Sequence, residues 1–195
     1  MARNPVVRAR PKPAPAGDYW DACIFIDYVQ SKSSADSNQA TALWDEAKEK
    51  KRVIHTSVIT IAEVAWYMAN TTTLTEEESK KIDALWHPDG PVQLWEVTPE
   101  LATQARQIRR DCRAKQPSIP IDNMDAIHLA TARSIPVARF ITKDHFKYAP
   151  EREKTTNLPD QRPTLSAMFG MELCHARPET MQFADAKLPH RADDE

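Results

Sequence analysis

Four acidic residues lie where an apolar segment ends or a helix-like segment begins in this 195-residue chain. Asp21 and Asp144 each close an apolar, strand-like run. Glu63 lies in the second turn of a segment with helical periodicity, and Asp125 opens another such segment. In an open parallel sheet, the carboxyl ends of the strands and the first turns of the following helices share one edge. Carboxylates gathered there repel one another unless a cation neutralises them. The pattern therefore predicts a site for a hard, oxygen-liganded cation such as Mg²⁺ or Mn²⁺.

Such a site suits the hydrolysis of a phosphodiester bond. The bond is anionic, and in-line attack by water adds negative charge that carboxylate-bound ions neutralise while they lower the pKa of the attacking water. No nucleophilic side chain is needed. The alternative interpretation is that the acids are helix caps and exposed loop charges, but four suitable positions in one chain favour the site. Zinc is less favoured because the cysteines and histidines lack zinc-ligand spacing.

Composition excludes several other classes of protein. The three glycines lie far apart, at Gly17, Gly90 and Gly170, whereas the phosphate-binding loops of dinucleotide-binding proteins, P-loop NTPases and kinases need closely spaced glycines. The three cysteines form no C-x-x-C motif, which suits a reducing cytoplasm. We expect no membrane span, because no apolar run is long enough, and we see no secretory signal pattern. A net charge of −2 argues against general coating of nucleic acid.

The elements that must position the acids alternate along the chain. We expect strands at 19–21, 52–56, 91–98 and 137–142, an apolar segment at 22–29, and helices at 38–51, 58–69, 75–87, 100–115 and 125–134. Strands separated by helices predict an α/β fold with a mainly parallel sheet. Helix starts are indicated by Thr75 with Glu78 in a capping-box spacing, by Pro99, and by Asp122 or Asn123.

One domain is expected over residues 18–174, with a tail on each side. Residues 1–17 contain three arginines, one lysine, four prolines and no acid, which predicts a disordered basic arm. The arm is a solvated tail, or it contacts nucleic acid or a partner. Residues 175–195 contain two prolines and end in Asp-Asp-Glu, which is typical of a polar, loosely held tail.

Four segments resemble the four sequence blocks of PIN domains, the family that includes the VapC-type ribonuclease toxins. They are YWDACIFID, HTSVITIAEV, NMDAIHLATA and FITKDHF, and the resemblance covers roughly residues 19–148. The resemblance implies a three-layer α/β/α sandwich with a central, mainly parallel sheet. It also implies that Asp21, Glu63 and Asp125 hold the metal, that Asp144 is the fourth acid, and that Thr142 and Ser57 support the site. Ala22 and Cys23 stand where the family usually has a hydroxyl or amide side chain.

The resemblance further implies an Mg²⁺- or Mn²⁺-dependent endoribonuclease, acting in the cytoplasm as the toxin of a toxin–antitoxin pair. A small antitoxin would bind across the active site, and the domain would form a homodimer. Two alternatives remain open. One is a catalytically silent PIN-like module that binds RNA or a protein. The other is a phosphohydrolase of small molecules, which would need a nucleophilic D-x-D near the first strand that Asp21-Ala-Cys does not supply.

Outside these blocks, one segment carries unusual positive charge. Five cations lie within ten residues of an expected helix, at Arg106, Arg109, Arg110, Arg113 and Lys115. They form either a solvated face or a stripe that contacts the phosphates of RNA. His128, one turn after Asp125, is a packed residue or one that orients a ligand.

Overall fold

The computed structural model describes residues 17–31, 39–71, 74–116, 118–143 and 160–175. Within them, five strands form one parallel sheet in the order β3-β2-β1-β4-β5. The strands are β1 Gly17–Trp20, β2 Val53–Ser57, β3 Val92–Trp95, β4 Arg139–Thr142 and β5 Glu172–His175. Parallel neighbours require long crossover connections, and helices lie in each of them. The predicted α/β fold with a parallel sheet is confirmed.

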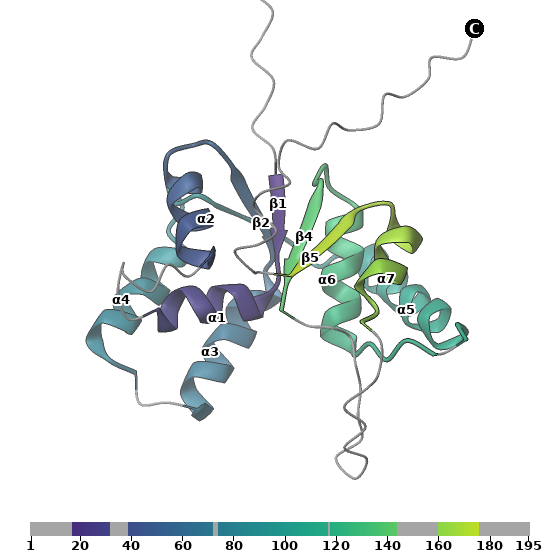
Figure 1. Ribbon diagram of the computed structural model, residues 1–195. Helices are drawn as coiled ribbons and strands as arrows, with labels where there is room; N and C mark the ends of the chain where they lie inside the picture. The colour runs from purple at the N-terminus through teal and green to yellow at the C-terminus, as the bar shows by residue number, and fades with distance from the viewer. Residues whose placement is uncertain (1–16, 32–38, 72–73, 117, 144–159, 176–195) are drawn as a thin grey trace, which may run out of the picture.

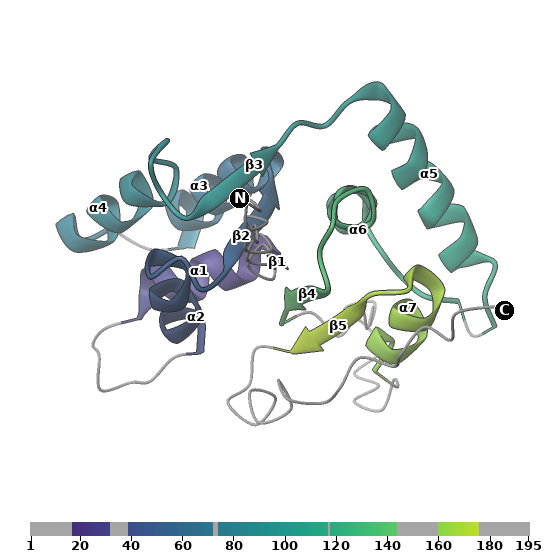
Figure 2. The same ribbon diagram turned by 90° about the horizontal axis from the view of Figure 1, so that it is seen from above.

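Helices cover both faces of the sheet, which confirms the three-layer arrangement (Figures 1 and 2). One face is covered by α1 Ala22–Gln30, α2 Gln39–Lys48, α3 Ile59–Thr71 and α4 Glu76–Leu85, and the other by α5 Pro99–Arg113, α6 Asn123–Arg133 and α7 Arg162–Phe169. Because side chains alternate across a strand, the neighbours Tyr19 and Trp20 of β1 enter opposite cores. None of the helices in the described part of the chain is long and apolar enough to cross a membrane.

The helix starts follow from local side chains. Thr75 and Glu78 form a capping box at the start of α4, as predicted. Thr98 caps α5, whose first residue is Pro99, where a missing N–H costs nothing. Asp122 caps α6 in a second capping box. Each cap satisfies N–H groups that the first turn of a helix leaves without a partner.

A buried charge network lies in the middle strand. Asp18 of β1 is 1% exposed and is the register partner of Arg139 in β4. Its carboxylate accepts hydrogen bonds from Arg139 Nε at 2.8 Å and Nη2 at 2.6 Å, and from Arg52 Nη1 at 3.0 Å. These guanidinium groups compensate the cost of burying the carboxylate, and they join β1 to the segments on both of its sides.

The C-terminal part of the sheet differs from the sequence-based expectation, which contained neither α7 nor β5. The helix α7 ends at Gly170, whose φ of 66° is left-handed, a conformation that favours glycine. β1 begins at Gly17, which pairs with Val53, and β5 ends at His175. The sheet thus extends one residue beyond each predicted bound of the domain. The rest of the predicted basic arm and polar tail lies outside the described residues.

Candidate active site

Asp21 lies directly after β1, at the carboxyl edge of the sheet, and caps α1. Its Oδ1 accepts a hydrogen bond from the Ala22 N–H at 2.7 Å. Its Oδ2 accepts one from the Thr142 hydroxyl at 2.8 Å. The Asp21 N–H donates to the carbonyl of Ile141 at 3.1 Å. These bonds hold the carboxylate, which is nearly buried, in one orientation between β1 and β4.

Cys23 occupies the position at which the family usually has a hydroxyl or amide group. Its sulfur lies 3.6 Å from Asp21 Oδ2 and 3.7 Å from Thr142 Oγ1, and it accepts a hydrogen bond from the Lys143 N–H at 3.2 Å. Burial, together with the charge of Asp21, raises the pKa of the Cys23 thiol well above its usual value. The thiol therefore stays neutral and acts as a weak donor to the carboxylate.

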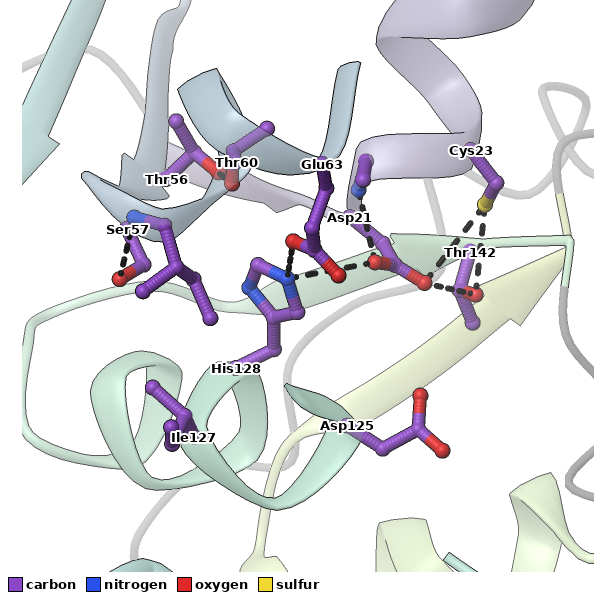
Figure 3. A network of polar contacts seen from close by, with 12 residues as sticks. Asp21, Cys23, Thr56, Ser57, Thr60, Glu63, Asp125, Ile127, His128 and Thr142 are labelled. Atoms are coloured by element: carbon purple, nitrogen blue, oxygen red, sulfur yellow. Dashed lines mark hydrogen bonds and ion pairs between the residues drawn. The ribbon is translucent and has the colours of Figure 1, made fainter. Parts of the chain in front are cut away.

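Glu63 and Asp21 approach each other through His128 (Figure 3). The Nε2 atom of His128 lies 2.7 Å from Glu63 Oε2 and 3.7 Å from Asp21 Oδ1. On the other side of the ring, Nδ1 lies 2.8 Å from the hydroxyl of Tyr19. Burial alone would lower the pKa of His128, but the hydrogen bond to Glu63 and the charges of the nearby acids outweigh burial and raise it. The imidazole thus lies between two carboxylates that favour its protonated form.

The other predicted site residues are placed less centrally. Asp125 lies in the first turn of α6, and its Oδ2 accepts a hydrogen bond from the Asp122 N–H at 3.1 Å. Its charge contributes to the raised pKa of His128, one turn further along. Ser57 is buried at the end of β2, and its hydroxyl accepts a bond from the Ile59 N–H at 3.4 Å. Asp144 lies outside the described residues.

A model of the PIN domain family matches residues 19–146, more than half of the chain. The chain belongs to the PIN domain family. Comparison with curated proteins finds no sequence match. The sequence resemblance to PIN domains is therefore confirmed.

Solved structures similar to this PIN domain include two that are bound to DNA fragments. VapBC2 from Rickettsia felis, bound to a DNA fragment from its promoter, aligns with a TM-score of 0.55 and 12% identity over 83% of this chain and 99% of that one. FitAB bound to the IR36 DNA fragment aligns with a TM-score of 0.51 and 14% identity over 82% and 94%. At these identities the likeness establishes the fold that they share.

The acidic side chains of this PIN domain are of the type that binds a divalent cation, but their positions do not form a complete metal site among the described residues. Carboxylate oxygens are the ligands that Mg²⁺ and Mn²⁺ prefer, and Asp21 and Glu63 both approach the same imidazole nitrogen. Among the described residues, however, no group of three His, Cys, Asp or Glu side chains lies close enough to hold a metal ion. His128 lies between two of the acids, and Asp125 is engaged in its capping box.

Two of the cavities lined by described residues bear on the site. One, of about 570 Å³ and mainly apolar, lies beside Glu63 and includes the exposed side chains of Trp66 and Met124. The other, of about 510 Å³, lies between α5 and α6 and is lined by the four predicted RNA-contacting arginines, Arg106, Arg109, Arg110 and Arg113.

Sequence reasoning missed the contacts of Tyr19 and His128. It treated the histidine chiefly as a packed residue, whereas the structure joins it to Glu63, 65 positions away, and to Tyr19, 109 positions away. One signal was available in the sequence. His128 follows Asp125 by three residues, and positions three apart share one face of a helix.

Proposed function

We propose that this PIN domain is a metal-dependent endoribonuclease that uses Mg²⁺ or Mn²⁺ and acts as the toxin of a toxin–antitoxin pair in the cytoplasm. One observation carries the proposal. Asp21 and Glu63, from different crossover units, converge to 3.7 Å and 2.7 Å from one nitrogen of His128. They do so at the carboxyl edge of a parallel sheet, where α/β proteins bind their ligands.

Each residue of the cluster has a role in this proposal. Asp21, Glu63 and Asp125 would hold the cation, with Asp144 as the fourth acid. When bound, the ion neutralises the scissile phosphate and lowers the pKa of the attacking water.

The surrounding side chains keep these acids in place. Thr142 and the Ala22 N–H orient the carboxylate of Asp21, and His128 orients that of Glu63. Ser57 supports the start of α3, the helix that carries Glu63.

Asp125→Asn, with Asp122→Asn as its matched control, tests the proposal. Both acids belong to the same capping box and both changes remove one charge, but only Asp125 is assigned to the metal. Asparagine caps about as well as aspartate, so each change should cost a few tenths of a kcal/mol. Loss of a transition-state interaction of about 3–4 kcal/mol would slow cleavage by Asp125→Asn roughly a hundred- to a thousandfold, whereas Asp122→Asn should cleave at nearly the parent rate.

The measurement is cleavage of single-stranded RNA with Mg²⁺ or Mn²⁺, beside a reaction containing EDTA. The thermal midpoints of the two variants, compared with the parent, show whether each is folded. Cleavage that persists in EDTA, or an Asp125→Asn variant as fast as Asp122→Asn, would contradict the metal-dependent mechanism.

An antitoxin partner and a homodimer belong to the same proposal. The two similar structures are VapBC2 and FitAB, each bound to a DNA fragment. The apolar cavity beside Glu63, with Trp66 68% exposed, offers a surface that a small partner protein would cover. Co-purification with the product of the neighbouring reading frame tests the antitoxin, and sedimentation of the chain alone tests the dimer.

A catalytically silent module is the second candidate. It is favoured by Ala22 and Cys23 in place of hydroxyl or amide residues, and by the position of His128 between Asp21 and Glu63. Calorimetric titration with Mn²⁺ separates the two candidates. An enzyme of the proposed kind binds Mn²⁺ and loses that binding in Asp125→Asn, whereas a silent module need not bind it.

A further inference from the structure

A cationic groove runs between α5 and α6, apart from the acid cluster. Its cavity of about 510 Å³ is lined on the α5 side by Arg106, Arg109, Arg110 and Arg113, and on the α6 side by Asn123, Ala126 and Ile127. The two helices pack side by side, with α6 between α5 and the sheet (Figure 2). The floor of the groove is thus formed by a rigid helix pair.

The charge of this groove is not neutralised by its surroundings. Within the described part of the chain, none of the four arginines forms a salt bridge, and three of them are exposed. Arg109 donates from Nη1 to the Asn123 side chain, but its Nε atom is buried with no acceptor among the described residues. An anion bound in the groove would give this donor an acceptor.

The position of the groove relates it to the acids. Asn123 lines the groove and Asp125 belongs to the acid cluster, and both lie in the first turn of α6. They are two residues apart, so they face different sides of the helix. A chain that lies in the groove and passes over the start of α6 therefore reaches the acids.

We propose that this arginine groove is a subsite for a backbone phosphate of single-stranded RNA, next to the nucleotide that is cleaved. The proposal rests on the nuclease function proposed above. Planar guanidinium groups match the geometry of a phosphate and donate two parallel hydrogen bonds to it. Such contacts position a strand without reading its sequence, so the groove confers affinity and direction rather than sequence choice.

RNA binding by a triple variant, Arg106→Gln, Arg110→Gln and Arg113→Gln, tests the subsite. Glutamine keeps a high helix propensity, and Arg109 is left in place because it contacts Asn123. Arg133→Gln removes one positive charge from the far end of α6, and it is the matched control for Arg110→Gln alone. All variants are full-length chains carrying Asp125→Asn in EDTA, so binding of a labelled RNA is measured by fluorescence anisotropy without cleavage.

Each phosphate contact to a single strand contributes about 0.7 to the slope of log affinity against log salt, or roughly fivefold in affinity at 0.1 M salt. The triple variant should therefore lose about a hundredfold in affinity and about two units of slope, while Arg133→Gln stays within about twofold of the background. Thermal midpoints establish that the variants are folded. If the triple variant does not fold, Arg110→Gln alone should lose about fivefold.

The outcomes separate this proposal from the nuclease proposal. The expected losses support the subsite even if the parent protein cleaves no RNA, in which case the nuclease proposal alone fails. Unchanged RNA affinity in the groove variants overturns the subsite even if cleavage is confirmed. A loss of RNA affinity equal to that of Arg133→Gln also overturns it. So does a groove variant that keeps its RNA affinity and loses only antitoxin binding or dimer formation.

Discussion

Replacing Thr142 by valine would test how firmly Asp21 is held. The Thr142 residue is fully buried, and its hydroxyl donates to Asp21 Oδ2 at 2.8 Å. Valine has nearly the same shape but lacks the hydroxyl, so the change removes one hydrogen bond and leaves the volume almost unchanged. The remaining donors to Asp21 are the Ala22 N–H and the weaker thiol of Cys23.

The magnitude follows from the type of bond. A hydrogen bond to a charged group stabilises a protein by about 1.5–3 kcal/mol, and here the acceptor stays buried when the donor is lost. For a chain of this size, each kcal/mol shifts the thermal midpoint by about 2–4 °C, so Thr142→Val should lower it by roughly 3–12 °C. Thr142→Ser keeps the hydroxyl and removes one methyl group, so it should cost only about 0.8 kcal/mol.

Urea denaturation and thermal melting of the three proteins, with and without Mg²⁺, provide the measurement. If Asp21 is a metal ligand, saturating Mg²⁺ should reduce the difference in free energy of unfolding between Thr142→Val and the parent. The ion would then replace the lost Thr142 hydroxyl as a partner of the Asp21 carboxylate. Two results would refute this reasoning, because the Thr142 hydroxyl would then contribute nothing beyond packing. One is a Thr142→Ser variant that is as destabilised as Thr142→Val. The other is a loss of less than about 0.5 kcal/mol in the free energy of unfolding of Thr142→Val.

Two further predictions concern the strands that carry the site. Asp18→Asn should lower the free energy of unfolding by about 3–5 kcal/mol in urea denaturation, because Arg52 and Arg139 lose the charge that compensates their burial; a loss below about 1 kcal/mol would contradict this. Burial lowers the pKa of His55 from its usual 6.5, although the charge of Asp18 acts in the opposite direction. The unfolded chain therefore binds the proton more tightly than the folded one. The free energy of unfolding should fall as the pH drops below about 6.5. In the folded protein, Nδ1 of His55 accepts a hydrogen bond from the Trp95 N–H at 3.1 Å, and a proton on Nδ1 would oppose this bond. His55→Gln should therefore weaken the pH dependence of stability between about pH 7 and 5. An unchanged pH profile would count against the assignment.

The sequence predicted most of the local structure correctly. Thr75 with Glu78, Pro99 and Asp122 indicated the helix starts that the structure has. Caps involve residues within one turn, so a single stretch of chain contains all the necessary information. The elements α7 and β5 were missed, because β5 is a short edge strand that exists through its pairing with β4 rather than through a strong pattern of its own.

The candidate site was predictable in part. The residues of the PIN blocks predicted four acids for the site, and the α/β alternation predicted an edge of the sheet. Of these acids, Asp21 and Glu63 approach one nitrogen of His128 there. That Asp144 completes the cluster stays a prediction, as do the metal and the RNA substrate. The contact of His128 with Glu63 could not be predicted, because it joins α6 and α3, which cover opposite faces of the sheet.

The sequence by itself determined which residues could do chemistry, where the helices begin, and that strands and helices alternate. These features depend on residue types and on neighbours within a few positions. Only the tertiary structure decided that Asp21 and Glu63 meet at His128, and that four arginines face Asn123 across a groove. Whether a hydrogen bond or ion pair forms depends on differences of a few tenths of an ångström in the distance between two atoms. These distances are set by the order of the strands and by the packing of helices that are far apart in the chain.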